Sequence, residues 1–238
     1  MNIAIIGYGK MGRTVESVGT SRGHLFPLII DENNREDLNG DRLGKVDVAI
    51  EFTSPRSAPG NIRTCLNHRV PVVSGSTGWD EEVESIEQYC RQMGGTLFHA
   101  SNFSIGVNVL FALNEQLARI MDRFPGYEPT LKEVHHVHKV DAPSGTAISL
   151  AKQIIGGHSR FHRWHSGTEA GEGSLPVESV REGEVKGQHS IRYESGVDLL
   201  TLSHEAKSRD AFAAGALLAA EFIREKKGVY TMKDLLQL

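Results

Sequence analysis

Apolar runs and amphipathic segments alternate regularly over the first hundred residues. The run at residues 2–6 predicts a buried strand, residues 10–21 a helix, and residues 25–31 a second strand that ends at an acid. The alternation continues, with further strands expected at residues 46–52, 71–74 and 96–100 and helices at residues 57–67 and 80–93. Because strands that alternate with helices form βαβ units, this part of the chain is predicted to be a Rossmann-like, doubly wound parallel sheet.

The pattern changes after a predicted helix at residues 107–124. An alanine-rich helix is expected later, at residues 209–227, and residues 229–238 close the chain. Residues 156–176 are rich in Gly, His and Ser and long for a connector, so they form either a functional loop or a mobile one. Longer strands are expected at residues 130–139, 177–184, 188–194 and 197–204, which indicates a second, α+β domain with a mixed sheet.

Composition narrows the class of protein. Hydrophobic residues make up 39% of the 238, enough for a sizeable core without a disulfide or metal staple. The net charge of -4 shows no basic excess, so no nucleic-acid partner is expected. The longest stretch without Lys, Arg, Asp or Glu, residues 92–114, carries His, Ser and Asn, so no membrane partner is expected either. With only two cysteines and no signal-peptide pattern, the expected location is the cytoplasm.

A glycine-rich turn follows the first predicted strand. Gly7, Gly9 and Gly12 have the G-x-G-x-x-G spacing at the start of a helix, where backbone N–H groups hold a pyrophosphate. The hexapeptide alone fits an ordinary tight turn equally well. Asp31, which ends the second strand nineteen residues after Gly12, favours dinucleotide binding because a carboxylate there accepts hydrogen bonds from the ribose hydroxyls.

Charge at this position bears on the choice of cofactor. Asp31 is followed by Glu32, and two adjacent acids repel a 2′-phosphate, so NADH is favoured over NADPH. Arg35 and Lys10 soften that preference, and NADPH remains possible. Two further strand ends, Phe52-Thr53-Ser54 and Gly75-Ser76-Thr77-Gly78, fit the rule that ligands bind at the carboxyl edge of a parallel sheet.

The densest polar constellation lies at residues 133–147. It matches the pattern E-x-H-H-x-x-K-x-D-x-P-S-G-T-A at every specified position, and this closely resembles the signature of the dihydrodipicolinate reductase (4-hydroxy-tetrahydrodipicolinate reductase) family. The resemblance extends over nearly the whole chain. It also covers Phe52-Thr53, Gly75-Ser76-Thr77-Gly78, residues 102–108, Arg181-Glu182-Gly183-Glu184, Gly187, His189, Ser208-Arg209 and Gly228-Val229-Tyr230.

The resemblance implies a function and an organisation. It implies reduction of 4-hydroxy-tetrahydrodipicolinate to tetrahydrodipicolinate in lysine and diaminopimelate biosynthesis, with NADH or NADPH, by a homotetramer. The expected domains are residues 1–103 with 209–238 for the dinucleotide, and residues 104–208 for substrate and oligomerisation. The cofactor-binding residues expected from the glycine turn, the strand ends and the resemblance are Gly7, Gly9, Lys10, Met11, Gly12, Asp31, Phe52, Thr53, Gly75, Thr77, Ser101, Asn102, Phe103 and Arg209.

The chemistry of the motif agrees with a dicarboxylate substrate. Lys139 supplies a cation, and Ser144-Gly145-Thr146 precede a predicted helix at residues 147–155, where hydroxyls and N–H groups hold a carboxylate. The alternative is a simple helix cap with Lys139 as a solvated strand residue. By resemblance, Lys139, Ser144, Gly145 and Thr146 bind the substrate, and Lys139 also assists the developing charge.

Histidine is the side chain best suited to proton transfer near neutral pH. If residues 130–139 are a strand, His136 and His138 share one face while His135 lies on the other. By resemblance, His135 is the general acid and His136 contacts a substrate carboxylate. A zinc site of the three histidines is an alternative, which the alternation of faces and the lack of a nearby cysteine disfavour, so no metal is expected.

Two other functions compete with this hypothesis. Another nicotinamide reductase of the same architecture, such as an amino-acid dehydrogenase, does not explain the match at residues 133–147. A non-catalytic dinucleotide-binding regulator does not need His135, Lys139 and residues 144–146. Because hydride transfer requires the two rings in contact, a hinge is expected, with the chain crossing between domains near Phe103-Ser104 and Ser208-Arg209.

Overall fold

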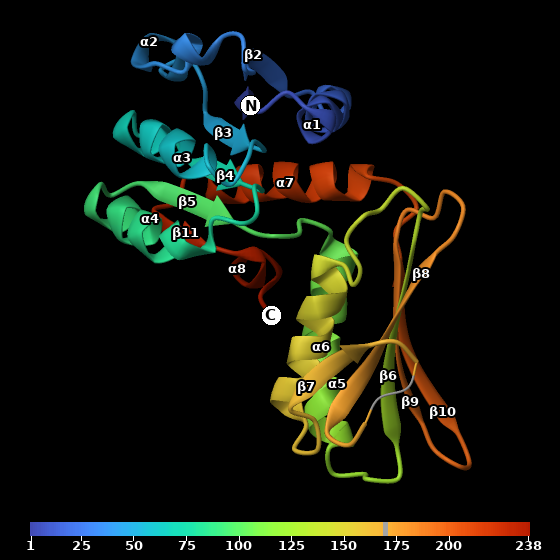
Figure 1. Ribbon diagram of the computed structural model, residues 1–238. Coiled ribbons are helices and arrows are strands. Elements are labelled where there is room, and N and C mark those ends of the chain that lie inside the picture. Colours follow the sequence, from blue (N-terminus) through green and yellow to red (C-terminus); the bar gives the residue numbers. More distant parts are fainter. Residues whose placement is uncertain (169–170) are drawn as a thin grey trace. The chain divides into compact units, whose positions relative to one another are not determined.

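The computed structural model describes residues 1–168 and 171–238, which divide into two compact units. The first contains Met1–Ile105 and Asp210–Leu238, and the second contains Gly106–Arg209 (Figure 1). The chain therefore passes from one unit to the other twice, and each unit is built around its own sheet.

The first unit is a six-stranded sheet in the order β11-β5-β4-β3-β1-β2, with every pair of neighbouring strands parallel. Its strands are β1 (Asn2–Ile6), β2 (Leu25–Ile30), β3 (Val48–Glu51), β4 (Val72–Ser74), β5 (Thr96–His99) and β11 (Gly228–Tyr230). Its helices are α1 (Lys10–Ser21), the short 3-10 turn η1 (Arg35–Asp37), α2 (Gly40–Leu43), α3 (Ala58–Asn67), α4 (Asp80–Gln92), α7 (Asp210–Ile223) and α8 (Met232–Leu236).

Helices cover both faces of this sheet, which is why its strands are apolar throughout. Ile3 and Ile5 of β1 pack in one core with residues of α1, α7 and α8. Ala4 and Ile6 point the other way, into a second core with residues of α2, α3 and α4. The predicted Rossmann-like parallel sheet is therefore confirmed.

The C-terminal segment differs from the expectation for residues 229–238. Residues 228–230 form β11, which pairs in parallel with β5 at the edge of the sheet, and α8 follows with Met232 buried in the core. The preceding helix α7 ends at Ile223, earlier than expected. A three-residue strand carries too little periodicity to be predicted, and its pairing with β5 is a tertiary contact.

The second unit is a five-stranded mixed sheet in the order β10-β9-β6-β8-β7. β6 is parallel to β8, and β8 to β7, whereas β9 is antiparallel to both β6 and β10. Helices α5 (Ile105–Met121) and α6 (Gly145–Gly157) pack on one face, as Figure 1 shows. The strands are β6 (Glu128–His135), β7 (Arg163–Ser166), β8 (Ser174–Arg181), β9 (Gln188–Glu194) and β10 (Leu199–Glu205), and they confirm the predicted mixed sheet.

Two expectations for this unit were wrong in ways that matter for the site. β6 ends at His135, and residues 136–139 form a turn instead of continuing the strand. The expected long loop at residues 156–176 contains the C-terminal part of α6, β7 and the start of β8; its residues 169–170 lie outside the described part. Over residues 1–168 and 171–238, no helix is both long and apolar enough to cross a membrane.

Candidate active site

The glycine turn between β1 and α1 is shaped by two close backbone approaches. Gly7 has φ of +99°, and a Cβ built there lies 2.1 Å from the carbonyl oxygen of Phe52. A Cβ at Gly12 lies 2.3 Å from the carbonyl oxygen of Gly7. Gly9, the N-cap of α1, has nothing within 4 Å of its Cβ position. The first and third glycines are therefore needed for packing, while the second borders open space at the helix N-terminus.

A cavity of about 600 Å³ opens beside this turn, entirely within the first unit. Gly7 and Gly9 line one part, and Asp31 and Glu32 line another at the carboxyl end of β2. Phe52 and Thr53 line it after β3, and two cations, Arg13 and Arg35, line it as well. The open helix N-terminus and a carboxylate at the end of β2 are the features that a dinucleotide requires, so these residues fit that cofactor.

A buried carboxylate supports the next strand ends. Glu51 is fully buried at the end of β3 and accepts hydrogen bonds from the Ser74 hydroxyl at 2.7 Å and the Ser76 hydroxyl at 2.9 Å. The Thr53 N–H donates to it at 2.9 Å, and the Thr53 hydroxyl donates as well. Glu51 thus ties the turn after β3 to the turn after β4. Glu51 was not among the residues predicted from the sequence, although an acid at the end of an apolar strand is a visible signal.

The remaining predicted cofactor residues surround these strand ends less directly. Phe52 packs against Phe103 with ring centroids 5.9 Å apart, and its ring fills the space where a Cβ at Gly75 would lie. Lys10, Met11 and Gly12 lie in α1, Gly75 and Thr77 follow β4, and Ser101, Asn102 and Phe103 follow β5. Arg209 is the last residue of the second unit.

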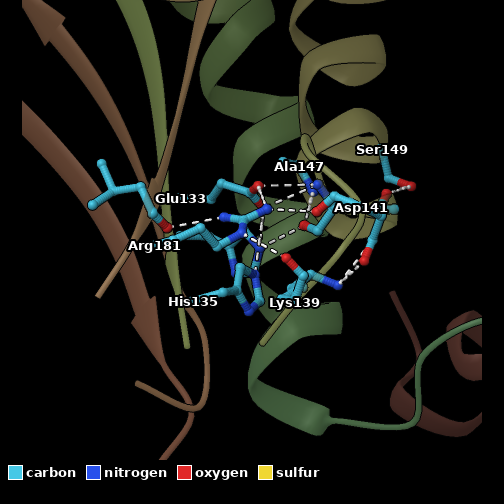
Figure 2. Close-up of polar contacts among 11 residues, drawn as sticks. Glu133, His135, Lys139, Asp141, Ala147, Ser149 and Arg181 are labelled. Atoms are coloured by element: carbon cyan, nitrogen blue, oxygen red, sulfur yellow. Dashed lines mark hydrogen bonds and ion pairs between the residues drawn. The ribbon is translucent and has the colours of Figure 1, made fainter. Parts of the chain in front are cut away.

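The second unit gathers the motif on the helix-covered face of its sheet. Glu133 of β6 stands opposite His189 of β9, and His189 stands opposite His204 of β10. His135, two residues after Glu133, lies on the same face beside Arg181 of β8 (Figure 2). The strand register therefore makes a compact polar row among residues far apart in sequence.

Glu133 is the centre of this row and has no exposed surface. Its two carboxylate oxygens each accept the Ser144 N–H at 3.1 Å, and Oε1 lies 3.3 Å from Nη2 of Arg181. Burial alone raises the pKa of this carboxyl, but hydrogen bonds from His135 and Ser144 outweigh it and hold the pKa well below its usual range. Glu133 is therefore an ionised carboxylate held in place from several sides.

His135 is 8% exposed, and its Nε2 lies 3.4 Å from Oε2 of Glu133. Gly187, with φ of +148°, accommodates the ring, since a Cβ there lies 2.9 Å from Cε1 and 3.3 Å from Nδ1 of His135. The structure thus places the predicted general acid between a carboxylate and the glycine that precedes β9, and this close approach requires Gly187.

His189 is buried beside His135, and the centroids of the two rings are 5.2 Å apart. Its Nε2 lies 3.2 Å from the Ser144 hydroxyl oxygen and 3.7 Å from Oε2 of Glu133. Burial, followed by the nearby His135, lowers the pKa of His189 to about 4. His189 is therefore neutral near pH 7, unlike an ordinary surface histidine.

The turn at residues 136–141 carries the predicted substrate lysine. Nζ of Lys139 lies 2.7 and 2.9 Å from the two carboxylate oxygens of Asp141, and this contact lowers the pKa of Asp141. Arg181 braces the turn by donating to the carbonyl of Lys139 at 3.2 Å and to the carbonyl of Asp141. Lys139 is therefore paired with Asp141 in this structure, so the predicted binding of a substrate carboxylate at Lys139 requires that carboxylate to replace or join Asp141.

The other predicted substrate residues surround the start of α6. Ser144 is its N-cap: the hydroxyl accepts the Ala147 N–H at 3.2 Å, so the simple cap foreseen as an alternative does exist. Gly145 and Thr146 begin the helix, and Gly145 is exposed. Ser144 itself is 3% exposed, so its main contacts are with Glu133 and His189.

The three histidines of the motif occupy three different environments. Because β6 ends at His135, the expected sharing of strand faces by His136 and His138 was wrong. His136 is partly buried, and burial, with the positive charge of Arg209, lowers its pKa despite Glu184. His138 has a side chain 75% exposed, with Nε2 3.5 Å from Glu184.

Another group with the residue types of a metal site is present. Glu133, His135 and His189 bring one possible ligand atom each within 4.8 Å of one another. This is a different set from the three neighbouring histidines considered from the sequence. The carboxylate already faces the Ser144 N–H and the Arg181 guanidinium, so a metal cation would meet resident positive charge. The set fits an ionic network better than a metal site.

Comparisons with known proteins agree with this arrangement. The family model described as Dihydrodipicolinate reductase, N-terminus, matches residues 1–103, and the one described as Dihydrodipicolinate reductase, C-terminus, matches residues 106–236. A curated protein of Christiangramia forsetii, named 4-hydroxy-tetrahydrodipicolinate reductase, is 44% identical over 237 residues, or 99% of this chain and 98% of its own. The protein of that name from Neisseria meningitidis serogroup B is 31% identical over 266 residues, or 100% and 98%.

Solved structures share the fold. A dipicolinate-bound dihydrodipicolinate reductase from Paenisporosarcina sp. TG-14 has a TM-score of 0.79 and 24% identity over 97% of both chains. An amine dehydrogenase from Mycobacterium smegmatis has a TM-score of 0.60 and 10% identity over 96% of this chain and 94% of its own. The two family models together span both units, and the chain belongs to the dihydrodipicolinate reductase family.

Proposed function

We propose that this chain reduces 4-hydroxy-tetrahydrodipicolinate to tetrahydrodipicolinate in lysine and diaminopimelate biosynthesis, with NADH as the preferred cofactor. The observation that carries the proposal is the polar row of the second unit, in which a buried histidine and a helix N-terminus come together within the family's motif. The family match supports the same reaction. The substrate unit is Gly106–Arg209, and the nucleotide unit is the remainder of the chain.

The nucleotide unit holds the cofactor in the cavity beside the glycine turn. Gly9 leaves room for the pyrophosphate at the N-terminus of α1, Gly7 lets the turn pack against the backbone of Phe52, and Asp31 accepts the ribose hydroxyls. Asp31 and Glu32 together disfavour a 2′-phosphate, which supports NADH. Arg13 and Arg35 line the same cavity and keep NADPH usable. When bound, the reduced nicotinamide supplies a hydride to the substrate.

The substrate unit binds a dicarboxylate. Lys139 exchanges its contact with Asp141 for a substrate carboxylate, and the first turn of α6, with Gly145 and Thr146, holds a carboxylate with backbone N–H groups. His136 contacts a carboxylate of the substrate. The name of the Paenisporosarcina structure, in which dipicolinate is bound to a reductase, supports a dicarboxylate ligand.

Proton transfer follows hydride transfer. His135 donates the proton, and Lys139 stabilises the developing negative charge. The chain passes between the units near residues 103–106 and 208–210, and these two passages are the proposed hinges. The net reaction consumes one hydride and one proton, and the hydroxyl group leaves as water.

A coupled assay tests the proposal. Substrate is generated from pyruvate and aspartate semialdehyde by dihydrodipicolinate synthase, and loss of NADH or NADPH absorbance is followed after the chain is added. We expect rapid loss that depends on the synthase, with a higher kcat/KM for NADH. Nucleotide binding without turnover would instead favour a non-catalytic dinucleotide sensor, and a higher kcat/KM for NADPH would contradict the argument from Asp31 and Glu32.

Two substitutions separate the roles within the substrate unit. His135→Gln removes the proton donor and is expected to lower kcat about 100-fold or more, the usual contribution of a general acid. An unchanged kcat would leave solvent as the proton source. Lys139→Ala should raise the substrate KM and lower kcat together, and an effect confined to NADH affinity would exclude the proposed role.

The proposal includes a homotetramer in the cytoplasm. The face of the second sheet opposite α5 and α6 supports it, because it presents partly exposed residues of several strands. Leu199 on this face is 46% exposed and is our candidate for an apolar contact between subunits.

A further inference from the structure

Glu133 has no role in the proposed reaction as described so far, although it is the most completely enclosed charged group of the motif. It is 0% exposed, whereas the neighbouring Lys139 and Asp141 have partly exposed side chains. Burying a charge is costly unless other groups compensate for it. The structure supplies those groups from β6, α6, β8 and β9: His135, Ser144, Arg181 and His189. We call these four residues and Glu133 the Glu133 cluster.

The contacts within the cluster divide between the two oxygens of the carboxylate. Arg181 lies on the Oε1 side, at 3.3 Å, and the Ser144 N–H is shared by both oxygens. The two histidines lie on the Oε2 side, His135 at 3.4 Å and His189 at 3.7 Å. The carboxylate is therefore anchored by a helix N-terminus and a guanidinium, and it presents its other oxygen to the proposed general acid.

The nitrogen that faces Glu133 determines which nitrogen is left for the substrate. Nε2 of His135 is buried and lies 3.4 Å from Oε2 of Glu133, without a regular hydrogen bond in this structure. Cε1 and Nδ1 of the ring pack close to Gly187, where a side chain would clash, and of the two ring nitrogens only Nε2 is buried without a partner. An imidazole held by a carboxylate at one nitrogen and reacting at the other is a recurrent arrangement in acid–base catalysis.

We propose that Glu133 is a positioning residue of the reductase: it holds Nε2–H of His135, so that His135 gives its proton to the substrate from Nδ1. This inference rests on the proposed function. In the step, the Nδ1–H bond of the imidazolium breaks, and the proton goes to the substrate atom made electron-rich by hydride addition. His135 is left as the neutral tautomer with hydrogen on Nε2, and solvent then restores the proton.

His189 completes the arrangement by staying neutral. The centroids of the two rings are 5.2 Å apart, so a charge on His189 would repel a proton on its neighbour. The deep burial of His189 lowers its pKa to about 4, so His189 adds no positive charge beside His135 near pH 7. With its Nε2 near the Ser144 hydroxyl, His189 also fixes the N-cap that anchors Glu133.

Three variants test the proposal in the full chain. Glu133→Gln keeps the size of the side chain but removes the charge, and we expect kcat to fall about 10- to 100-fold, part of the general-acid contribution. The substrate KM and the NADH Kd should change less than about 3-fold, because Glu133 is fully buried and is not one of the residues proposed to bind either ligand. Glu133→Asp, which restores the charge, should recover part of kcat. Glu115→Gln, which changes a partly exposed glutamate of α5 that pairs with Arg119, is the matched control and should behave as the wild type.

A spectroscopic measurement of the His135 tautomer tests the same inference without relying on enzyme activity. With 15N-labelled histidine, the ring nitrogen shifts of His135 distinguish hydrogen on Nε2 from hydrogen on Nδ1 in the free protein. We expect Nε2–H as the dominant neutral tautomer in the wild type and a mixture in Glu133→Gln. Unchanged kcat in a folded Glu133→Gln, or an Nδ1–H tautomer in the wild type, would overturn the inference. Absence of reductase activity in the wild type would instead refute the proposed function, so the two failures are distinguishable.

Discussion

At the scale of single residues, neighbours in the fold give identical side chains different properties. His135, His136 and His138 are consecutive or nearly so, yet the first is buried against Glu133, the second is partly buried and the third is exposed. Strand alternation predicted a different arrangement, because it assumed that the strand continues to Lys139. Contacts from Arg181 to the carbonyls of Lys139 and Asp141 hold a turn there instead, and no local pattern indicates them.

The buried His189 predicts how stability depends on pH. Its pKa is about 4 in the folded chain and about 6.5 in the unfolded chain, so the unfolded state binds the proton first as pH falls. The stabilisation is complete above pH 6.5 and is lost as pH decreases to 4. We expect a loss of about 3 kcal/mol over this window, measured by urea unfolding at successive pH values.

The groups that face His189 refine this prediction. They are Glu133, His135, His204 and Lys139. The pKa of Glu133 is lowered in the folded chain, so protonation of Glu133 also destabilises the fold as pH falls. This loss occurs at a lower pH than the loss caused by His189. His189→Gln should therefore flatten the curve between pH 6.5 and 5, whereas His138→Gln, at an exposed site, should leave it unchanged. Parallel curves for the wild type and His189→Gln would contradict the assignment.

At the scale of elements, substitutions in the turn between β1 and α1 distinguish effects on folding stability from effects on cofactor binding. Gly7 combines a positive φ with a contact of 2.1 Å to backbone, so Gly7→Ala should cost more than about 2 kcal/mol of stability. Gly9 has open space around it, so Gly9→Ala should change stability by less than about 0.5 kcal/mol. Titration with NADH should nevertheless show a Kd raised about 10-fold or more, since the methyl group occupies the phosphate's approach. Equal NADH affinity for Gly9→Ala and wild type would show that the pyrophosphate lies elsewhere.

The ends of β3 and β4 depend on a single side chain. Glu51→Gln turns an amide N–H2 toward the hydroxyl and N–H donors of Thr53, Ser74 and Ser76, so at least one donor is left unsatisfied. We expect a loss of about 1–3 kcal/mol in thermal or urea unfolding, with weaker NADH binding by fluorescence titration. Glu84→Gln on the exposed side of α4 serves as the comparison. A Glu51→Gln protein with wild-type stability and NADH affinity would show that the two turns hold their positions without it.

At the scale of the whole molecule, the proposed function assigns the cofactor to one compact unit and the substrate and the contact between subunits to the other. Leu199 of β10 stands opposite Glu194 of β9, on the face away from α5 and α6. If this face joins subunits, light scattering of the wild type should give a mass four times the 26.1 kDa of the chain.

A charged substitution tests whether this face is the interface. Leu199→Glu removes an apolar contact and adds a charge that is costly to bury, so the mass should fall to that of a dimer or monomer. Leu25→Glu, at a residue 66% exposed on β2 of the other unit, should leave the mass unchanged. A tetramer retained by Leu199→Glu would place the interface on another surface.

Much of this protein follows from local sequence. Periodicity of apolar residues predicted the parallel sheet and most of its helices, because burial on one or two faces dictates that spacing. The glycine spacing followed by Asp31 predicted the nucleotide turn, and the motif at residues 133–147 predicted the family that the comparisons confirm. Other features depended on long-range pairing: β11 beside β5, the end of β6 at His135, and the placing of Glu133, Arg181 and His189 around one imidazole. These residues come from separate strands, so only the register of the folded sheet brings their charges within reach of one another.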